Sequence, residues 1–230
     1  MVTNISVLKE NNHYPNSHHS MNPNLNELLR WSVANSTNPP DASAISNQGL
    51  NPNSLNALFG GPTDAELMIT SMEAIRSSNP DVKLEDKLVA FDNFEQLVEN
   101  IDNANNLEST RLWGPLLECL DHEEGGIRKM AAWCIGTAVQ NNIKGQEMLL
   151  AKAGLPKLVK IATAEGEATQ VRKKAIYALS SACRNYQPAM DVLTDELRKL
   201  GKRSASVDAK DMEACDELME ALKEAAFANS

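Results

Sequence analysis

The chain has 230 residues, of which 42% are apolar and only 4% aromatic, a composition that suits packed helices better than aromatic-rich strands. Its formal net charge of −9 makes it a poor counterion for a phosphate backbone, which excludes nucleic acid and anionic membranes as expected partners. No stretch approaches the roughly 20 apolar residues needed to span a bilayer, and the first residues lack the basic start and apolar core of a signal peptide.

Residues 1–63 differ in composition from the rest. They hold six of the ten prolines, thirteen asparagines and only five charged side chains. Such a segment cannot bury enough apolar surface to offset its chain entropy, so we expect it to be largely disordered. We interpret residues 1–20 as a disordered extension. Met21 is an alternative start, which would make that extension foreign to the native protein.

Residues 21–63 are expected to form a flexible segment with short helices. The stretch "LNELLRWSVANS", residues 25–36, has leucines at helical spacing beside Trp31. Two interpretations stay open for it: a short helix docked on the domain, or a mobile segment with a binding role. The stretch "LNALFGG", residues 55–61, ends in two glycines before Pro62 and predicts a helix stop and a hinge.

From Thr63 onward the pattern is helical almost without a break. Thr63 and Glu66 have the spacing of a capping box and predict a helix start. The four cysteines form no CxxC pair, and three of them fall on apolar helical positions. We expect them to be small buried hydrophobes in a reducing compartment, not a disulfide or a zinc site.

Three segments of the chain repeat one another. They begin at Lys87, Arg128 and Arg172, at offsets of 41 and 44 residues. Each opens on a basic residue and follows a turn. Four further sets of positions coincide: Ala90, Ala131 and Ala175; Phe94, Ile135 and Leu179; Leu97, Ala138 and Ala182; Asn100, Asn141 and Asn185.

A period near 40 residues with short, medium and long helices predicts an all-α armadillo or HEAT-like solenoid of about three repeats over residues 64–200. The long helices are expected near 84–101, 126–142 and 169–186. Two more helices, near 188–200 and 208–227, would form a polar C-terminal cap, with residues 201–230 as the capping helix. The alternative is an ordinary helical bundle whose segments are alike by chance.

Amide side chains gather where the long helices are expected to end. Amides exchange hydrogen bonds without the desolvation cost of full charges, so a row of them on a concave face suits recognition of another protein. The alternative is C-capping, since asparagine is favoured past a helix end. The predicted partner-binding residues are Asn100, Asn103, Ala104, Asn105, Gln140, Asn141, Asn142, Arg184, Asn185 and Tyr186.

The runs "KLVAFDNFEQLVENIDNANNL", "MAAWCIGTAVQNN" and "RKKAIYALSSACRNYQPAMDVL" resemble the fungal armadillo-type nucleotide-exchange factors of the 70-kDa heat-shock chaperone, the Fes/HspBP family. "LLRWSVANS" and "LFGGPTDAELM" add to the likeness, which covers the chain from about Met21 onward. One departure is that longer members of the family carry a further repeat after the third. Contacts made by such a repeat are therefore in doubt for this chain.

The resemblance implies a cytosolic cochaperone that is not an enzyme and needs no cofactor. Its concave face would grip the chaperone's ATPase domain as a 1:1 complex of monomers, so that ADP leaves and the client is released. The N-terminal segment would help free the client, and members are also linked to cytosolic translation.

Two other functions have less support in the sequence. A metal site at His122 with the carboxylates of Glu123 and Glu124 is disfavoured, because a charged turn is usually solvated. The sequence also offers no Ser/His/Asp arrangement that supports catalysis. A generic armadillo adaptor such as a transport carrier would repeat a Trp with an Asn four residues later. Here Thr137 follows Trp133 and Ser181 follows Tyr177 at that spacing, and the array is short.

Overall fold

The computed structural model describes residues 60–202 and 205–228, and the predicted segments at 1–20, 25–36 and most of 55–61 lie outside these residues. The chain divides into two units, 1–61 and 62–230, and the description below concerns the second. Its described residues form ten α-helices and one short 3₁₀ helix, with no strand among them. The all-α solenoid predicted from the sequence is therefore confirmed.

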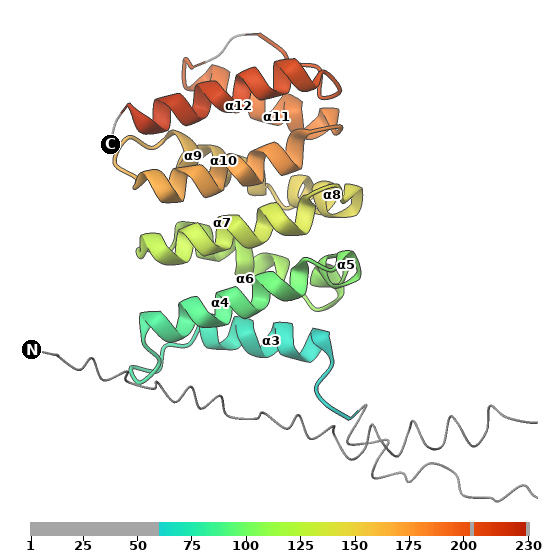
Figure 1. The fold of residues 1–230 in the computed structure, drawn as a ribbon, viewed down its shortest axis with the longest axis vertical. Helices are drawn as coiled ribbons and strands as arrows, with labels where there is room; N and C mark the ends of the chain where they lie inside the picture. The colour runs from blue at the N-terminus through green and yellow to red at the C-terminus, as the bar shows by residue number, and fades with distance from the viewer. Residues whose placement is uncertain (1–59, 203–204, 229–230) are drawn as a thin grey trace, which may run out of the picture. The chain divides into compact units, whose positions relative to one another are not determined.

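The longer helices stack in chain order to form one layer (Figure 1). α3 packs on α4, α4 on α7, α7 on α10, and α10 on α12. The layer consists of α3 (Asp64–Ile75), α4 (Leu84–Val98), α7 (Gly125–Val139), α10 (Thr169–Cys183) and α12 (Met212–Phe227). The face of this layer that looks away from the shorter helices is called the long-helix face below.

The shorter helices form a second layer behind the first (Figure 1). α8 and α9 pack on each other and on α10, and α11 packs on α9 and α10. The layer consists of α5 (Ile101–Ser109), α6 (Trp113–Glu118), the 3₁₀ helix η1 (Cys119–Asp121), α8 (Ile143–Ala151), α9 (Gly154–Thr163) and α11 (Gln187–Lys199). Two short helices therefore precede each of α7 and α10, which is the unit expected of an armadillo repeat.

The repeated positions make the spine between the layers. At the first two sets, every residue is at most 8% exposed, from Ala90 and Phe94 on α4 to Ala175 and Leu179 on α10. Ala138 and Ala182 are also buried, and Leu97 packs at the margin of the core. A single repeat could not cover this apolar surface, so neighbouring repeats stabilise one another.

The long helices are shorter than the sequence pattern suggested. They end at Val98, Val139 and Cys183, whereas their ends were expected near residues 101, 142 and 186. The backbone leaves the helical region at the residues that follow, with positive φ angles of 52° at Asn141 and 59° at Asn185. The amide-rich stretches after α7 and α10 are therefore turns that lead into α8 and α11, whereas Asn103, Asn105 and Asn106 lie within α5.

The start of α3 agrees with the capping box predicted from the sequence. The Glu66 backbone N–H donates to Oγ1 of Thr63 at 3.2 Å, and the Thr63 backbone N–H donates to Oε2 of Glu66 at 2.8 Å. These two bonds satisfy donors that a helix start leaves without partners.

The C-terminal end of the stack is held by a buried cation. Arg172, only 2% exposed, donates from Nε to the carbonyl oxygen of Ala162 at 3.1 Å. Its other nitrogens donate to the carbonyl oxygens of Ala225 at 3.0 Å and Ala226 at 3.3 Å. Carbonyls at a helix C-terminus lack partners within the helix and carry partial negative charge, so the guanidinium ties α12 onto α10.

The cysteines are buried, as the sequence predicted. All four are buried and free. Burial raises the pKa of the Cys119 thiol to about 11 and that of Cys134 well above its usual range, so these thiols stay protonated and inert. Among the described residues, no helix is both long and apolar enough to cross a bilayer.

Candidate partner-binding face

Polar contacts cross the three junctions of the long-helix face that lie between α4 and α12. Oγ1 of Thr137 on α7 donates to Oε1 of Glu95 on α4 at 2.7 Å. The Tyr177 hydroxyl on α10 donates to Oε1 of Gln140 at 3.0 Å. Arg184 reaches Oδ1 of Asp216 on α12 at 2.5 Å. Each contact joins side chains of neighbouring units, so the groups on this face are held in fixed positions relative to one another.

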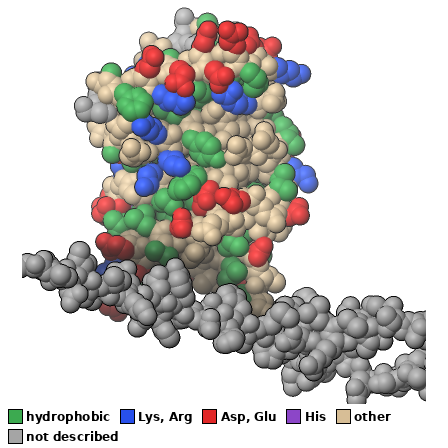
Figure 2. Space-filling model, in the orientation of Figure 1, with side chains coloured by type: hydrophobic (Ala, Val, Ile, Leu, Met, Phe, Trp, Pro, Cys, Tyr) green, Lys and Arg blue, Asp and Glu red, His purple; other side chains and the backbone are tan. Residues whose placement is uncertain are grey.

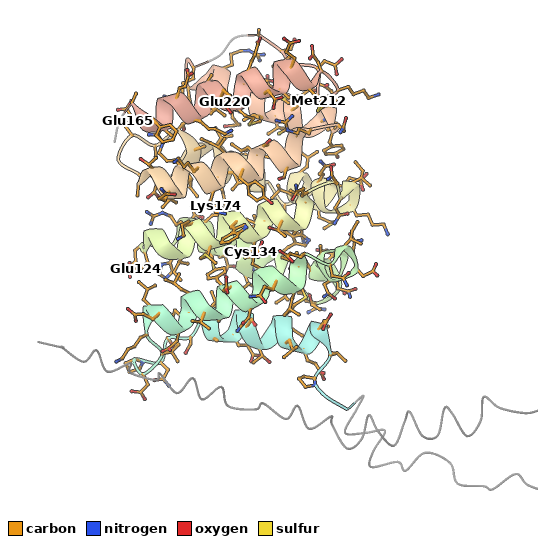
Figure 3. All side chains as sticks on the ribbon, viewed as in Figure 1. Glu124, Cys134, Glu165, Lys174, Met212 and Glu220 are labelled. Carbon is orange, nitrogen blue, oxygen red and sulfur yellow. The ribbon has the colours of Figure 1, made fainter. Side chains whose placement is uncertain are left out.

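The middle of the face carries a cluster of cations and aromatic rings. Nζ of Lys174 lies 3.4 Å from the centroid of the Trp133 ring and 5.6 Å from that of Tyr177. Figure 3 shows Lys174 at the junction of α10 and α7. Burial and the nearby charge of Lys129 lower the pKa of Lys174, while Glu95 acts in the opposite direction. The ammonium group is therefore only partly solvated.

The three aligned asparagines have structural roles in the turns. The side chain of Asn100 accepts the Asp102 backbone N–H at 2.9 Å and caps α5. Asn141 and Asn185 take the left-handed backbone conformation, which asparagine adopts more readily than most residues. The Asn185 N–H also donates to the carbonyl oxygen of Ala209 at 2.8 Å. Asn141 and Asn185 therefore have the conformation expected past a helix end, the alternative that the sequence left open, whereas Asn100 caps the start of α5. Partner contact by the same residues stays a prediction.

Three of the ten predicted contact residues are buried, which corrects the expectation that all of them line an exposed face. Asn103 is 7% exposed and donates to Oδ2 of Asp64 at 2.8 Å and to the Leu97 carbonyl oxygen at 3.0 Å. Asn142 is 4% exposed and donates to the Ala138 carbonyl oxygen at 2.9 Å. Ala104 is 2% exposed. Their side chains support the turns and offer almost no surface.

Of the remaining predicted residues, Asn105 lies on α5, and the others lie at one edge of the long-helix face, in the turns that follow its helices. Arg184 and Tyr186 are half-buried, and Asn105 is partly exposed. The exposed members are Asn100, Gln140, Asn141 and Asn185. The structure therefore brings the exposed and partly exposed residues together as an edge, next to the lysine and aromatic cluster that occupies the middle.

A hollow of about 230 Å³ lies beside this edge, between α5 and α8. Ala104, Asn105 and Trp113 line one side of it, and Gly145 and Met148 the other. Oδ1 of Asn105 is buried with no hydrogen-bond partner among the described residues. Unsatisfied buried acceptors are uncommon, so this atom is suited to accept a donor.

Sequence reasoning missed the aromatic centre of the face. Trp133 and Tyr177 were weighed only as departures from the motif of transport carriers. Their separation, 177 − 133 = 44 residues, equals the repeat offset between Arg128 and Arg172. That equality was the available signal that the two rings occupy equivalent positions of neighbouring units.

The side chain of His122 makes a hydrogen bond within its own turn. Nδ1 of His122 accepts the Glu124 backbone N–H at 3.0 Å. Across the part of the chain that the structure describes, no group of three or more His, Cys, Asp or Glu residues is placed to hold a metal ion.

Comparison with known proteins decides the family. The model described as "Nucleotide exchange factor Fes1" matches residues 25–107, and the "SIL1/FES1/HPBP1 C-terminal domain" matches residues 103–196. A protein of Gibberella zeae named "Hsp70 nucleotide exchange factor FES1" is 59% identical over 206 residues, which cover 88% of this chain and 96% of that protein. The chain belongs to the Fes1 family.

Other Fes1 relatives differ in length. The "Hsp70 nucleotide exchange factor fes-1" of Neurospora crassa is 47% identical, over 88% of this chain and 98% of the relative. The FES1 protein of Eremothecium gossypii is 43% identical, over 74% of this chain but only 59% of the relative. The family resemblance noted in the sequence is confirmed.

Proposed function

We propose that this Fes1-family chain is a nucleotide-exchange factor for Hsp70. Its long-helix face would bind the chaperone's ATPase domain and speed the release of ADP, so that ATP rebinds and the client is released. The observation that carries the proposal is the 59% identity over 88% of the chain to a protein named as an Hsp70 nucleotide exchange factor.

The mechanism requires no catalytic group in this chain. An exchange factor acts by binding the open, nucleotide-free form of its partner more tightly than the closed form. A shift from 1:99 to 99:1 in favour of the open form requires about 5.5 kcal/mol of differential affinity. The cross-helix contacts of Glu95, Gln140 and Asp216 support such a role, because a face that holds its shape can resist closure of a bound partner.

Two regions of the face are proposed to contact the ATPase domain. The lysine and aromatic cluster around Trp133 and Lys174 would meet the middle of the partner's surface. The turns that contain Gln140, Asn141 and Asn185 would meet its edge, where exposed amides can bond polar groups without the cost of desolvating a charge.

The proposed setting is the cytoplasm, with a 1:1 complex of monomers and an indirect influence on cytosolic translation. Support for a reducing compartment comes from the four buried free thiols. The Fes1 model begins at residue 25, so the segment that contains Trp31 is part of what the family shares. We propose that this segment helps to free the client.

The test is stopped-flow release of a fluorescent ADP analogue from a purified cytosolic Hsp70, with and without the full chain. The proposal predicts a release rate that rises with the chain's concentration and saturates. A chain that lacks residues 1–59 should keep this acceleration but release a bound model peptide less completely. If the folded full chain leaves the ADP release rate unchanged, the proposed function is wrong.

A further inference from the structure

The sign of the charged side chains on the long-helix face differs from helix to helix. Figure 2 shows Lys and Arg side chains gathered over the middle of this face, with Asp and Glu above and below them. α7 and α10 supply Lys129, Lys173 and Lys174. α12 supplies exposed carboxylates such as Asp216 and Glu220. A positive centre is unexpected in a chain whose formal net charge is −9.

The three lysines have no carboxylate partner among the described residues. Nine salt bridges join described side chains, and none of them includes Lys129, Lys173 or Lys174. Two of the ammonium groups lie over aromatic rings instead: Lys174 over Trp133 at 3.4 Å and Lys173 over Phe227 at 4.1 Å. A ring holds one side of a cation and leaves the other side free for an anion.

The surroundings of Lys174 favour an incoming negative charge. The group is partly desolvated, and Lys129 repels it. The nearby carboxylate of Glu95 is itself buried, and its Oε1 accepts the Thr137 hydroxyl. Opposite charges attract more strongly where water is partly excluded. A carboxylate that docks here would therefore interact more strongly with Lys174 than with a fully solvated lysine.

The first 59 residues are poorly suited to fill this role themselves. They contain three carboxylates, Glu10, Glu27 and Asp41, against Lys9 and Arg30, which gives 2 − 3 = −1. A segment that is nearly neutral offers little charge complementarity to three lysines. The complementary surface is therefore expected on another protein.

We propose that Lys129, Lys173 and Lys174, together with the Trp133 ring, form a docking site for an acidic surface element of the partner protein, with a partner carboxylate placed against Lys174. This inference rests on the proposed function, which makes that partner the ATPase domain of Hsp70. The site would set the register of the complex and its association rate, which are the properties that charge complementarity controls most strongly.

The test compares two charge reversals in the ADP-release assay. Lys174→Glu alters the proposed site. Lys160→Glu is the matched control, because Lys160 lies on α9 in the layer behind, its side chain is 79% exposed, and the net charge changes equally. Lys174→Glu should raise the half-saturating concentration about tenfold at low salt, and Lys160→Glu should leave it within about twofold. The difference should narrow as salt screens the charges.

Two further variants keep the test falsifiable. Lys174→Arg, which retains the charge and can stack on Trp133, should raise the half-saturating concentration less than Lys174→Glu does. Lys129→Glu should weaken binding in the same direction as Lys174→Glu, and circular dichroism should show that both are folded. Suppose that the wild type accelerates release but Lys174→Glu and Lys160→Glu change the half-saturating concentration equally or not at all. The proposal of a docking site is then wrong. If the wild type itself does not accelerate release, the proposed function fails and this inference fails with it.

Discussion

The ring of Tyr177 on α10 rests directly against the backbone of Gly136 on α7. A Cβ atom at Gly136 would lie 2.5 Å from Cε1 of that ring, closer than two non-bonded carbon atoms can approach. The absent side chain therefore lets α7 and α10 approach closely and places the Tyr177 hydroxyl within reach of Gln140. This junction joins two units of the spine to the exposed face.

Gly136→Ala should destabilise the protein. The added methyl group must displace Tyr177 or separate the helices, and overpacking of this kind costs about 1–3 kcal/mol. Gly126→Ala on the same helix is the control, because its Cβ would meet side-chain atoms only at 3.5 Å or more. We expect that control to be neutral or slightly stabilising, since alanine favours helix over glycine. Equal unfolding free energies for the two variants in urea would contradict this explanation.

Asn141 allows its turn role to be separated from partner contact. Asn141→Gly keeps the left-handed conformation that φ of 52° requires but removes the amide, whereas Asn141→Ala strains the turn by about 1 kcal/mol. We expect the glycine variant to unfold like the wild type yet need about threefold more protein for half-maximal ADP release. If its half-saturating concentration is unchanged, Asn141 serves only the turn and its amide does not contact the partner.

Arg172→Met should loosen the C-terminal helix. The substitution keeps an apolar stem but removes the donors to three carbonyl oxygens, at a cost of about 3 kcal/mol. Hydrogen exchange should speed up in α12 more than in α4, at the other end of the stack. Arg198→Met, which alters an exposed ion pair with Asp195, should leave both properties nearly unchanged. If exchange in Arg172→Met speeds up equally in α4 and α12, or in neither helix, Arg172 does not have this role.

The ion pair of Arg128 with Glu167 predicts part of the acid sensitivity. Nε of Arg128 lies 2.6 Å from Oε2 of Glu167, and this bond holds the carboxyl's pKa below its usual range. Because the folded pKa is the lower one, the stabilisation is complete above the unfolded pKa of about 4.3 and is lost as pH falls through the folded pKa.

Glu167→Gln should therefore lower the unfolding free energy by about 1–3 kcal/mol at neutral pH. The difference between this variant and the wild type should shrink as the pH falls from about 4 through the folded pKa, below which Glu167 is protonated in both states of the wild type. Urea unfolding of both proteins at a series of acidic pH values measures this difference in unfolding free energy. A gap that stays constant as the pH falls would show that the carboxylate's charge is not the cause.

The fold could be predicted from the sequence because periodicity records which side chains face the spine. Ala131, Ile135 and Ala138 recur at the spacing of a buried helix face, and all three are buried. The capping box at Thr63 was equally local, since its partners lie three residues apart.

The roles of the basic residues that open the long helices could not be predicted in the same way. Lys87, Arg128 and Arg172 are equivalent in the repeat, yet their surroundings differ. Lys87 is half-buried, Arg128 pairs with Glu167, and Arg172 binds the end of α12. Their partners come from loops and helices that lie outside the repeated pattern.

The same limit applies to the candidate site. The amides were recognised as a set, but whether each caps a turn or faces outward depends on backbone angles such as those at Asn141 and Asn185. The position of Lys174 over Trp133 depends on how α10 sits across α7, which is a matter of packing between units.

Site-specific photo-crosslinking tests most directly the claim that the long-helix face binds Hsp70. A photoreactive amino acid would replace Gln140, which is exposed at the end of α7, or Lys160 on the layer behind, and each protein would be irradiated with the nucleotide-free ATPase domain. We expect a strong crosslink from position 140 and little from position 160. Efficient crosslinking from position 160 with none from position 140 would place the chaperone on the other side of the solenoid and contradict this claim.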